Sequence, residues 1–102
     1  MKADPPPFPI LVYVCTNARA SGERVSCAAA GRDGLRLKDE LKRLVKEGGW
    51  SDRIRICSSG CMDRCEEGPN AVRLGASGNE WISHLATGDL PALVERLAQN
   101  LP

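Results

Sequence analysis

The residues best suited to chemistry in this chain are its five cysteines. Cys61 and Cys65 are separated by three residues, in a polar segment that ends in Gly-Pro. Cys15 and Cys27 lie far upstream, and Cys57 is the fifth. Thiolates are soft ligands that bind zinc, cuprous copper or iron–sulfur clusters in preference to hard cations. Four of these five thiols are therefore candidate ligands of one metal centre.

Length, composition and charge are those of one ordinary globular domain. The chain has 102 residues, of which 42% are apolar and 26% are charged, and its net charge is +1. A net charge this close to zero creates no overall electrostatic attraction to nucleic acid or to an anionic membrane surface. The longest apolar run, residues 10–15, is far shorter than the ~20 residues that cross a bilayer. Prolines stand where a signal peptide would need its apolar segment, so the cysteines are expected in the reducing cytoplasm as metal or redox ligands rather than as disulfides.

Periodicity predicts one α/β domain over residues 10–102, preceded by a proline-rich tail over residues 1–9. Continuous and alternating apolar patterns predict strands, and apolar stripes at three- and four-residue spacing predict helices. The expected strands are 10–14, 53–57, 71–74 and 80–85, and the expected helices are 34–47 and 89–101. The first helix should carry an Asp39–Arg43 ion pair, and Asp89 should cap the second. The order, strand-helix-strand followed by a hairpin and a C-terminal helix, is that of a thioredoxin-like sandwich with a mixed four-stranded sheet.

This order predicts that the thiols meet at one edge of the sheet. Cys15 ends the first strand and Cys27 lies in the loop that follows it, whereas Cys61 and Cys65 lie in the loop after the second strand. If these strands are parallel neighbours, both loops leave the same edge. Cys57 belongs to the alternating strand, and its side chain should lie on the face opposite Ile54.

The spacing of the cysteines is compatible with more than one kind of metal centre. Structural zinc sites usually draw on two short knuckles, and only the Cys61–Cys65 pair resembles one. A 2Fe-2S cluster needs two thiolates on each iron, which a wide pair and a tight pair can provide. A thiol–disulfide oxidoreductase is a further alternative, although no C-x-x-C occurs in the chain.

Three segments of the sequence resemble the thioredoxin-like 2Fe-2S ferredoxins, a family related to the 2Fe-2S subunit of respiratory NADH dehydrogenase. They are Cys15-Thr16-Asn17-Ala18-Arg19, Ser26-Cys27-Ala28-Ala29-Ala30-Gly31, and Ser59-Gly60-Cys61-Met62-Asp63-Arg64-Cys65-Glu66-Glu67-Gly68-Pro69. The resemblance implies that Cys15, Cys27, Cys61 and Cys65 hold one 2Fe-2S cluster and that Cys57 is not required.

The resemblance also implies a small soluble electron carrier that is not itself an enzyme. Its partners would be redox proteins, a donor and an acceptor, and a homodimer is an alternative to the monomer. Loop amides around Thr16, Asn17 and Met62 are expected to donate to sulfur. Pro69 precedes the third expected strand, where thioredoxin folds carry a cis proline, and the sequence alone leaves its isomer open.

Overall fold

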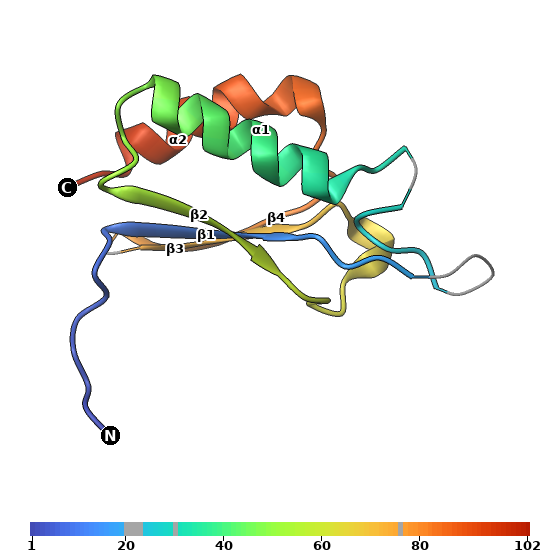
Figure 1. Ribbon diagram of the computed structural model, residues 1–102, viewed down its shortest axis with the longest axis horizontal. Helices are drawn as coiled ribbons and strands as arrows, with labels where there is room; N and C mark the ends of the chain where they lie inside the picture. Colours follow the sequence, from blue (N-terminus) through green and yellow to red (C-terminus); the bar gives the residue numbers. More distant parts are fainter. Residues whose placement is uncertain (20–23, 30, 76) are drawn as a thin grey trace.

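A computed structural model describes residues 1–19, 24–29, 31–75 and 77–102. It contains one four-stranded sheet and two α-helices, joined by loops and two short 3-10 helices, η1 and η2 (Figure 1). The elements in chain order are β1 (Ile10–Cys15), α1 (Gly34–Glu47), β2 (Ile54–Ser59), η1 (Cys65–Glu67), β3 (Ala71–Gly75), β4 (Gly78–Ile82), η2 (Thr87–Asp89) and α2 (Leu90–Gln99).

The sheet has the order β2-β1-β3-β4 and is mixed. β1 pairs with β2 in parallel, whereas the β1–β3 and β3–β4 pairs are antiparallel. This arrangement confirms the expected thioredoxin-like sandwich, including the parallel first pair and the hairpin. Neither helix among the described residues is long and apolar enough to cross a membrane.

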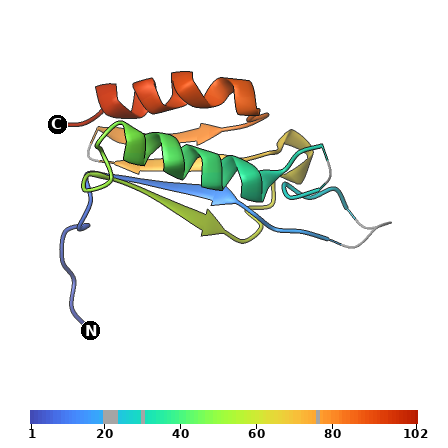
Figure 2. The ribbon, with the colours of Figure 1, turned by 45° about the horizontal axis from the view of Figure 1, so that its top comes forward.

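Both helices lie on one face of the sheet, and no helix formed by the described residues covers the other face (Figures 1 and 2). The strands alternate in burial because successive side chains point to opposite faces. The apolar core therefore lies between the sheet and the helices. Its most buried members include Ile10, Val12, Leu41, Ile54, Leu90 and Leu97.

Two local sequence predictions are wrong. Arg43 pairs with Glu40 and Glu47 rather than with Asp39, which contacts Lys38 instead. The last strand ends at Ile82 and does not continue to residue 85. His84 has φ 50°, a left-handed conformation that a β-strand cannot accommodate.

The N-cap of α2 also differs from the sequence prediction, in the hydrogen bond that its side chain makes. Asp89 occupies the N-cap position, but its carboxylate makes no capping hydrogen bond to α2. Instead, Oδ2 accepts a hydrogen bond from the Ala86 amide at 2.9 Å. The carboxylate therefore stabilises the start of η2 rather than the first turn of α2.

β1 and β2 end side by side, because Cys15 pairs with Ser59 in their parallel register. The loops after both strands leave this edge, together with η1, at one end of the molecule (Figure 1). The Gly68–Pro69 bond, between η1 and β3, is cis. This end contains the four thiols that the sequence singles out.

Candidate metal centre

Cys15 and Cys27 form the first pair of thiols. Cys15 is the last residue of β1, and its amide donates to the Asn70 carbonyl at 3.0 Å. The carbonyl of Cys27 accepts a hydrogen bond from the Gly34 amide at 2.8 Å, which joins its loop to the start of α1. Burial is the main cause that raises the pKa of Cys15, and the neighbouring Cys27 thiol raises it further. The residues are only 2% and 1% exposed, so the pair is dry.

Cys61 and Cys65 form the second pair, with their sulfurs 3.4 Å apart. Cys65 begins η1 and is 3% exposed, whereas Cys61 is exposed to solvent. The Asp63 amide donates to Cys61 Sγ at 3.3 Å. This bond, followed by the Cys65 thiol and the guanidinium of Arg19, lowers the pKa of Cys61.

Arg19 contacts both thiols of the second pair. Its Nη1 donates to Cys65 Sγ and its Nη2 donates to Cys61 Sγ, each at 3.1 Å. The bond to Cys65 is the main cause that raises the pKa of Arg19, so the guanidinium stays charged. The positive charge of Arg19 is one of the causes that lower the pKa of Cys61 and so favour its thiolate form.

Arg24 joins the two loops through carboxylates. Its Nε and Nη2 bind the two oxygens of Glu66 at 2.8 and 2.7 Å, and Nη1 lies 2.6 Å from Asp63 Oδ1. The bidentate contact with Arg24 lowers the pKa of Glu66 to about 2. Although these groups are exposed, they connect residues that are about forty positions apart in the chain.

Arg32 reinforces the same connection through the backbone. Its Nη1 donates to the Cys65 carbonyl at 2.5 Å. The same carbonyl also accepts a hydrogen bond from the Gly68 amide at 3.1 Å. The segment before α1 therefore holds the turn that carries Cys65.

Gly68 leaves space that a side chain would occupy. A Cβ at this position would lie 2.8 Å from Cys27 Sγ, 2.8 Å from Arg32 Nη1 and 3.2 Å from the Cys65 carbonyl oxygen. Its φ of −73° is open to any residue, so the constraint is steric rather than conformational. The backbone at Gly68 thus passes directly over a buried thiol.

The four thiols approach as two pairs rather than as one tetrahedron. Among the described residues, no three Cys, His, Asp or Glu side chains converge closely enough to hold a single metal ion. Cys57 is not part of either pair. It pairs with Tyr13 in the β1–β2 register and is half-buried, while its neighbour Ile56 is 4% exposed on the helix side.

The sulfur donors differ in part from those expected. The backbone N–H of Asn17, one of the expected donors, acts to lower the pKa of Cys15 against the larger effect of burial. Thr16 instead donates to the Ser59 carbonyl at 3.1 Å, and Asp63 supplies the amide at Cys61. Arg19 is a contact that the sequence reasoning missed, because the two thiols that it reaches lie 46 and 42 positions away in the chain.

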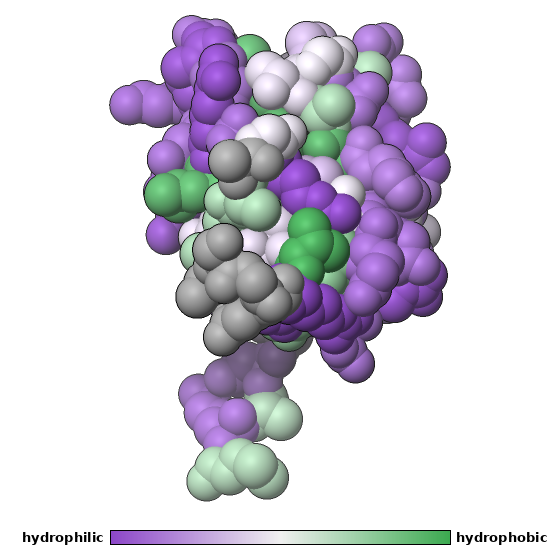
Figure 3. Space-filling view, turned by 90° about the vertical axis from the view of Figure 1, so that its right-hand side faces the viewer, coloured by the Kyte–Doolittle hydropathy of each residue, from purple (hydrophilic) through white to green (hydrophobic). Residues whose placement is uncertain are grey.

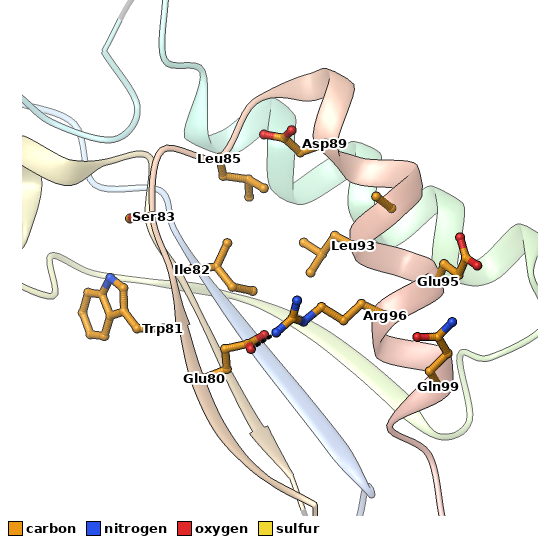
Figure 4. Close-up of a pocket in the computed structure, with 11 residues that line it drawn as sticks. Glu80, Trp81, Ile82, Ser83, Leu85, Asp89, Leu93, Glu95, Arg96 and Gln99 are labelled. Atoms are coloured by element: carbon orange, nitrogen blue, oxygen red, sulfur yellow. Dashed lines mark hydrogen bonds and ion pairs between the residues drawn. The ribbon is translucent and has the colours of Figure 1, made fainter.

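Figure 3 views this end of the molecule from outside. Its surface is mainly hydrophilic, with a paler and more hydrophobic area in the middle. A separate groove lies between β4 and α2 and contains the Glu80–Arg96 ion pair (Figure 4). Its described lining includes charged, amide and aliphatic side chains and none of the five cysteines. The groove is therefore distinct from the thiol site.

Comparison with solved structures finds close matches in fold. The wild-type thioredoxin-like [2Fe-2S] ferredoxin from Aquifex aeolicus superposes with a TM-score of 0.79 at 23% identity, over 91% of this chain and 88% of that one. A second structure of a thioredoxin-like [2Fe-2S] ferredoxin from Aquifex aeolicus gives a TM-score of 0.80 at 23% identity, over 93% and 86%. A variant of that ferredoxin with one cysteine changed to serine gives 0.78 at 24% identity, over 91% of each chain. No protein-family model matches the sequence, and no curated protein matches it.

Proposed function

We propose that this chain is a thioredoxin-like 2Fe-2S ferredoxin, a small soluble carrier that passes single electrons between redox proteins in the cytoplasm. Cys15, Cys27, Cys61 and Cys65 are the proposed ligands of one 2Fe-2S cluster. The observation that carries the proposal is the arrangement of these thiols as two close pairs at one end of the molecule. The shared fold with solved 2Fe-2S ferredoxins supports the same reading.

The donor set fits a binuclear cluster in number and in chemistry. Each iron of a 2Fe-2S cluster takes two thiolates, and the irons are separated by bridging sulfides. The Cys61–Cys65 sulfurs, 3.4 Å apart, and the adjacent Cys15–Cys27 thiols match one pair for each iron. All four groups are soft ligands, as iron–sulfur clusters require.

The same arrangement argues against the two alternatives. A structural zinc ion needs four ligands around one point, whereas the described thiols stay in two pairs. A thiol–disulfide oxidoreductase of the usual kind needs C-x-x-C, and the paired Cys61 and Cys65 have three residues between them. Electron transfer through a bound cluster is the function that these residues support best.

When bound, the cluster supplies a site that accepts and releases one electron. The protein's own part is to stabilise the negative charge that ligation and reduction bring to this end of the molecule. Arg19 supplies a cation at Cys61 and Cys65, and the Asp63 amide donates to Cys61. Hydrogen bonds to ligand sulfurs and nearby positive charge raise the reduction potential.

The burial pattern indicates where electrons enter and leave. Cys15, Cys27 and Cys65 are each at most 3% exposed, whereas Cys61 is exposed. The charged residues around it are largely paired, through Arg24 with Asp63 and Glu66. We therefore expect partners to approach the Cys61 side and to exchange electrons there.

A visible absorption spectrum tests the proposal, together with iron, sulfide and zinc content of protein purified without oxygen. A ferredoxin should be reddish, should contain iron and sulfide in equal amounts, and should bleach with dithionite. Its reduced form should give an S = 1/2 paramagnetic signal of about one spin for each pair of irons. A colourless protein with stoichiometric zinc would contradict the proposal.

A further inference from the structure

Asn70 carries a buried polar side chain beside the thiols that the ligand set does not explain. It lies between Pro69 and β3 and is 2% exposed. Its Nδ2 lies 2.6 Å from the Arg64 carbonyl oxygen and 3.8 Å from Cys27 Sγ. Its Oδ1 accepts a hydrogen bond from Trp81 Nε1 at 3.2 Å. Every polar atom of the buried amide therefore has a partner, as burial requires.

The partners also determine which way the amide faces. An indole N–H can only donate, so the amide oxygen must face Trp81. A carbonyl oxygen can only accept, so the NH2 group must face Arg64. The two amide hydrogens then serve the Arg64 carbonyl and the sulfur of Cys27. The orientation of the amide is therefore fixed by the donor at Trp81 and by the acceptor at Arg64.

Trp81 holds this amide from the open face of the sheet. It projects from the side of β4 opposite Ile82 and Glu80, which point toward α2 (Figure 4). Trp81 is 43% exposed, and its ring lies 5.8 Å from the guanidinium of Arg64. Arg64 thus contacts both residues: its carbonyl oxygen accepts from Asn70, and its guanidinium lies over the ring of Trp81.

We propose that Asn70 is a positioning residue of the metal centre, which donates an N–H to Cys27 Sγ and raises the reduction potential of the cluster. Trp81 keeps the amide in the orientation that makes this donation. The Asn70 carbonyl also accepts the Cys15 amide at 3.0 Å, so one residue contacts both members of the first pair. This inference rests on the proposed function, because a potential exists only with the cluster bound.

The physical reason is the charge on sulfur. Reduction adds negative charge to the cluster and its thiolates, and an N–H donor stabilises the reduced form more than the oxidised form. The donation takes place at a residue that is 1% exposed, where water cannot replace the lost donor. Removal of the donor should therefore lower the potential rather than leave it unchanged.

Two variants test the two roles separately. Asn70→Leu removes the N–H donor to Cys27 Sγ, and Trp81→Phe removes the hydrogen bond that orients the Asn70 amide. Asn70→Leu keeps the side-chain size and removes both amide hydrogens, whereas Trp81→Phe keeps a six-membered aromatic ring and removes the indole N–H together with its five-membered ring. Asn79→Leu and Trp50→Phe are matched controls, since Asn79 lies on the exposed hairpin and Trp50 packs near the end of α1. Each variant is reconstituted as the full-length holoprotein.

The readouts are the midpoint potential and pulsed paramagnetic resonance of the reduced protein with 15N in its asparagine side-chain amides. Asn70→Leu should lower the reduction equilibrium constant by up to about tenfold, which is ~59 mV for one electron, and should lose a 15N coupling to the cluster. Trp81→Phe should shift the potential in the same direction by less, and the controls should not shift it.

Failure of this inference is distinct from failure of the proposed function. A colourless wild-type protein would overturn the function. A red wild-type protein whose potential and 15N coupling are unchanged in Asn70→Leu would overturn the role of Asn70 alone. If Asn70→Leu does not fold, an unshifted potential and unchanged coupling in Trp81→Phe would overturn it instead.

Discussion

The guanidinium of Arg19 donates to Cys65 Sγ at 3.1 Å, although the two residues are 46 positions apart in the chain. The same guanidinium reaches Cys61 Sγ through its other nitrogen. One side chain from the first ligand loop therefore contacts both thiols of the second. This contact joins the loops and places a cation beside two of the four proposed cluster ligands.

Arg19→Gln should lower the reduction potential by tens of millivolts, where ~59 mV corresponds to a tenfold change in the equilibrium. Glutamine keeps a donor but removes the charge that favours thiolate and reduced cluster. Protein-film voltammetry measures the shift. Lys46→Gln is the matched control, because it removes one positive charge from the last turn of α1, about three turns from the thiol end. Equal potentials in Arg19→Gln and Lys46→Gln would show that Arg19 does not act on the cluster.

Gly68→Ala should weaken the site, whereas Gly60→Ala should not. The added methyl would lie 2.8 Å from Cys27 Sγ, a buried atom with little room to move, while nothing lies within 4 Å of a Cβ at Gly60. Such overpacking typically costs about 1–3 kcal/mol. Iron content after reconstitution and thermal unfolding of the holoprotein measure the effect. A similar loss in both variants would point to backbone flexibility of the loop instead of contact with the thiol.

Cys61 should be the first thiol to react with iodoacetamide in reduced, cluster-free protein. It is exposed and its pKa is lowered, first by the Asp63 amide, so more of it is thiolate at neutral pH than of an ordinary cysteine. Its rate should therefore rise at lower pH than that of a free thiol. Cys15 should react last, since it is buried and its pKa is raised.

Peptide mass spectrometry over a time course gives the order of alkylation. Arg19→Gln should slow the reaction of Cys61 at neutral pH, because one of the groups that lower its pKa is lost. Faster modification of half-buried Cys57 than of Cys61 would contradict the thiol environments described here.

Cys57→Ser should leave the spectrum and iron content nearly unchanged. Cys57 lies in β2 opposite Tyr13 and outside both thiol pairs. Serine at Cys15, Cys27, Cys61 or Cys65 should instead strip the cluster or shift its absorption, since a hard alkoxide replaces a soft thiolate. Visible spectra and iron analysis of the five variants test the ligand set. Cluster loss in Cys57→Ser with retention in Cys15→Ser would reverse the assignment.

Local residue spacing was sufficient to predict the elements and their order, because buried positions recur at the period of each strand and helix. Alternation of Ile54 and Ile56 predicted β2 and its buried face, and both are confirmed. The stripe from Leu37 to Val45 predicted α1, whose observed bounds match those expected. The parallel first pair then followed from chain topology, which brings the loops with Cys15 and Cys61 to one edge.

The side chains that contact the thiols could be identified from the folded structure but not from the sequence. Arg19 and Asn70 reach sulfurs 42 to 46 residues away in the chain, so no local spacing marks them. The ion pairs of Arg43 were also beyond prediction, because several carboxylates lie within reach on one helix and rotamers select among them. Contacts between distant segments depend on how the loops pack against one another. That packing, unlike periodicity, is a property of the whole fold.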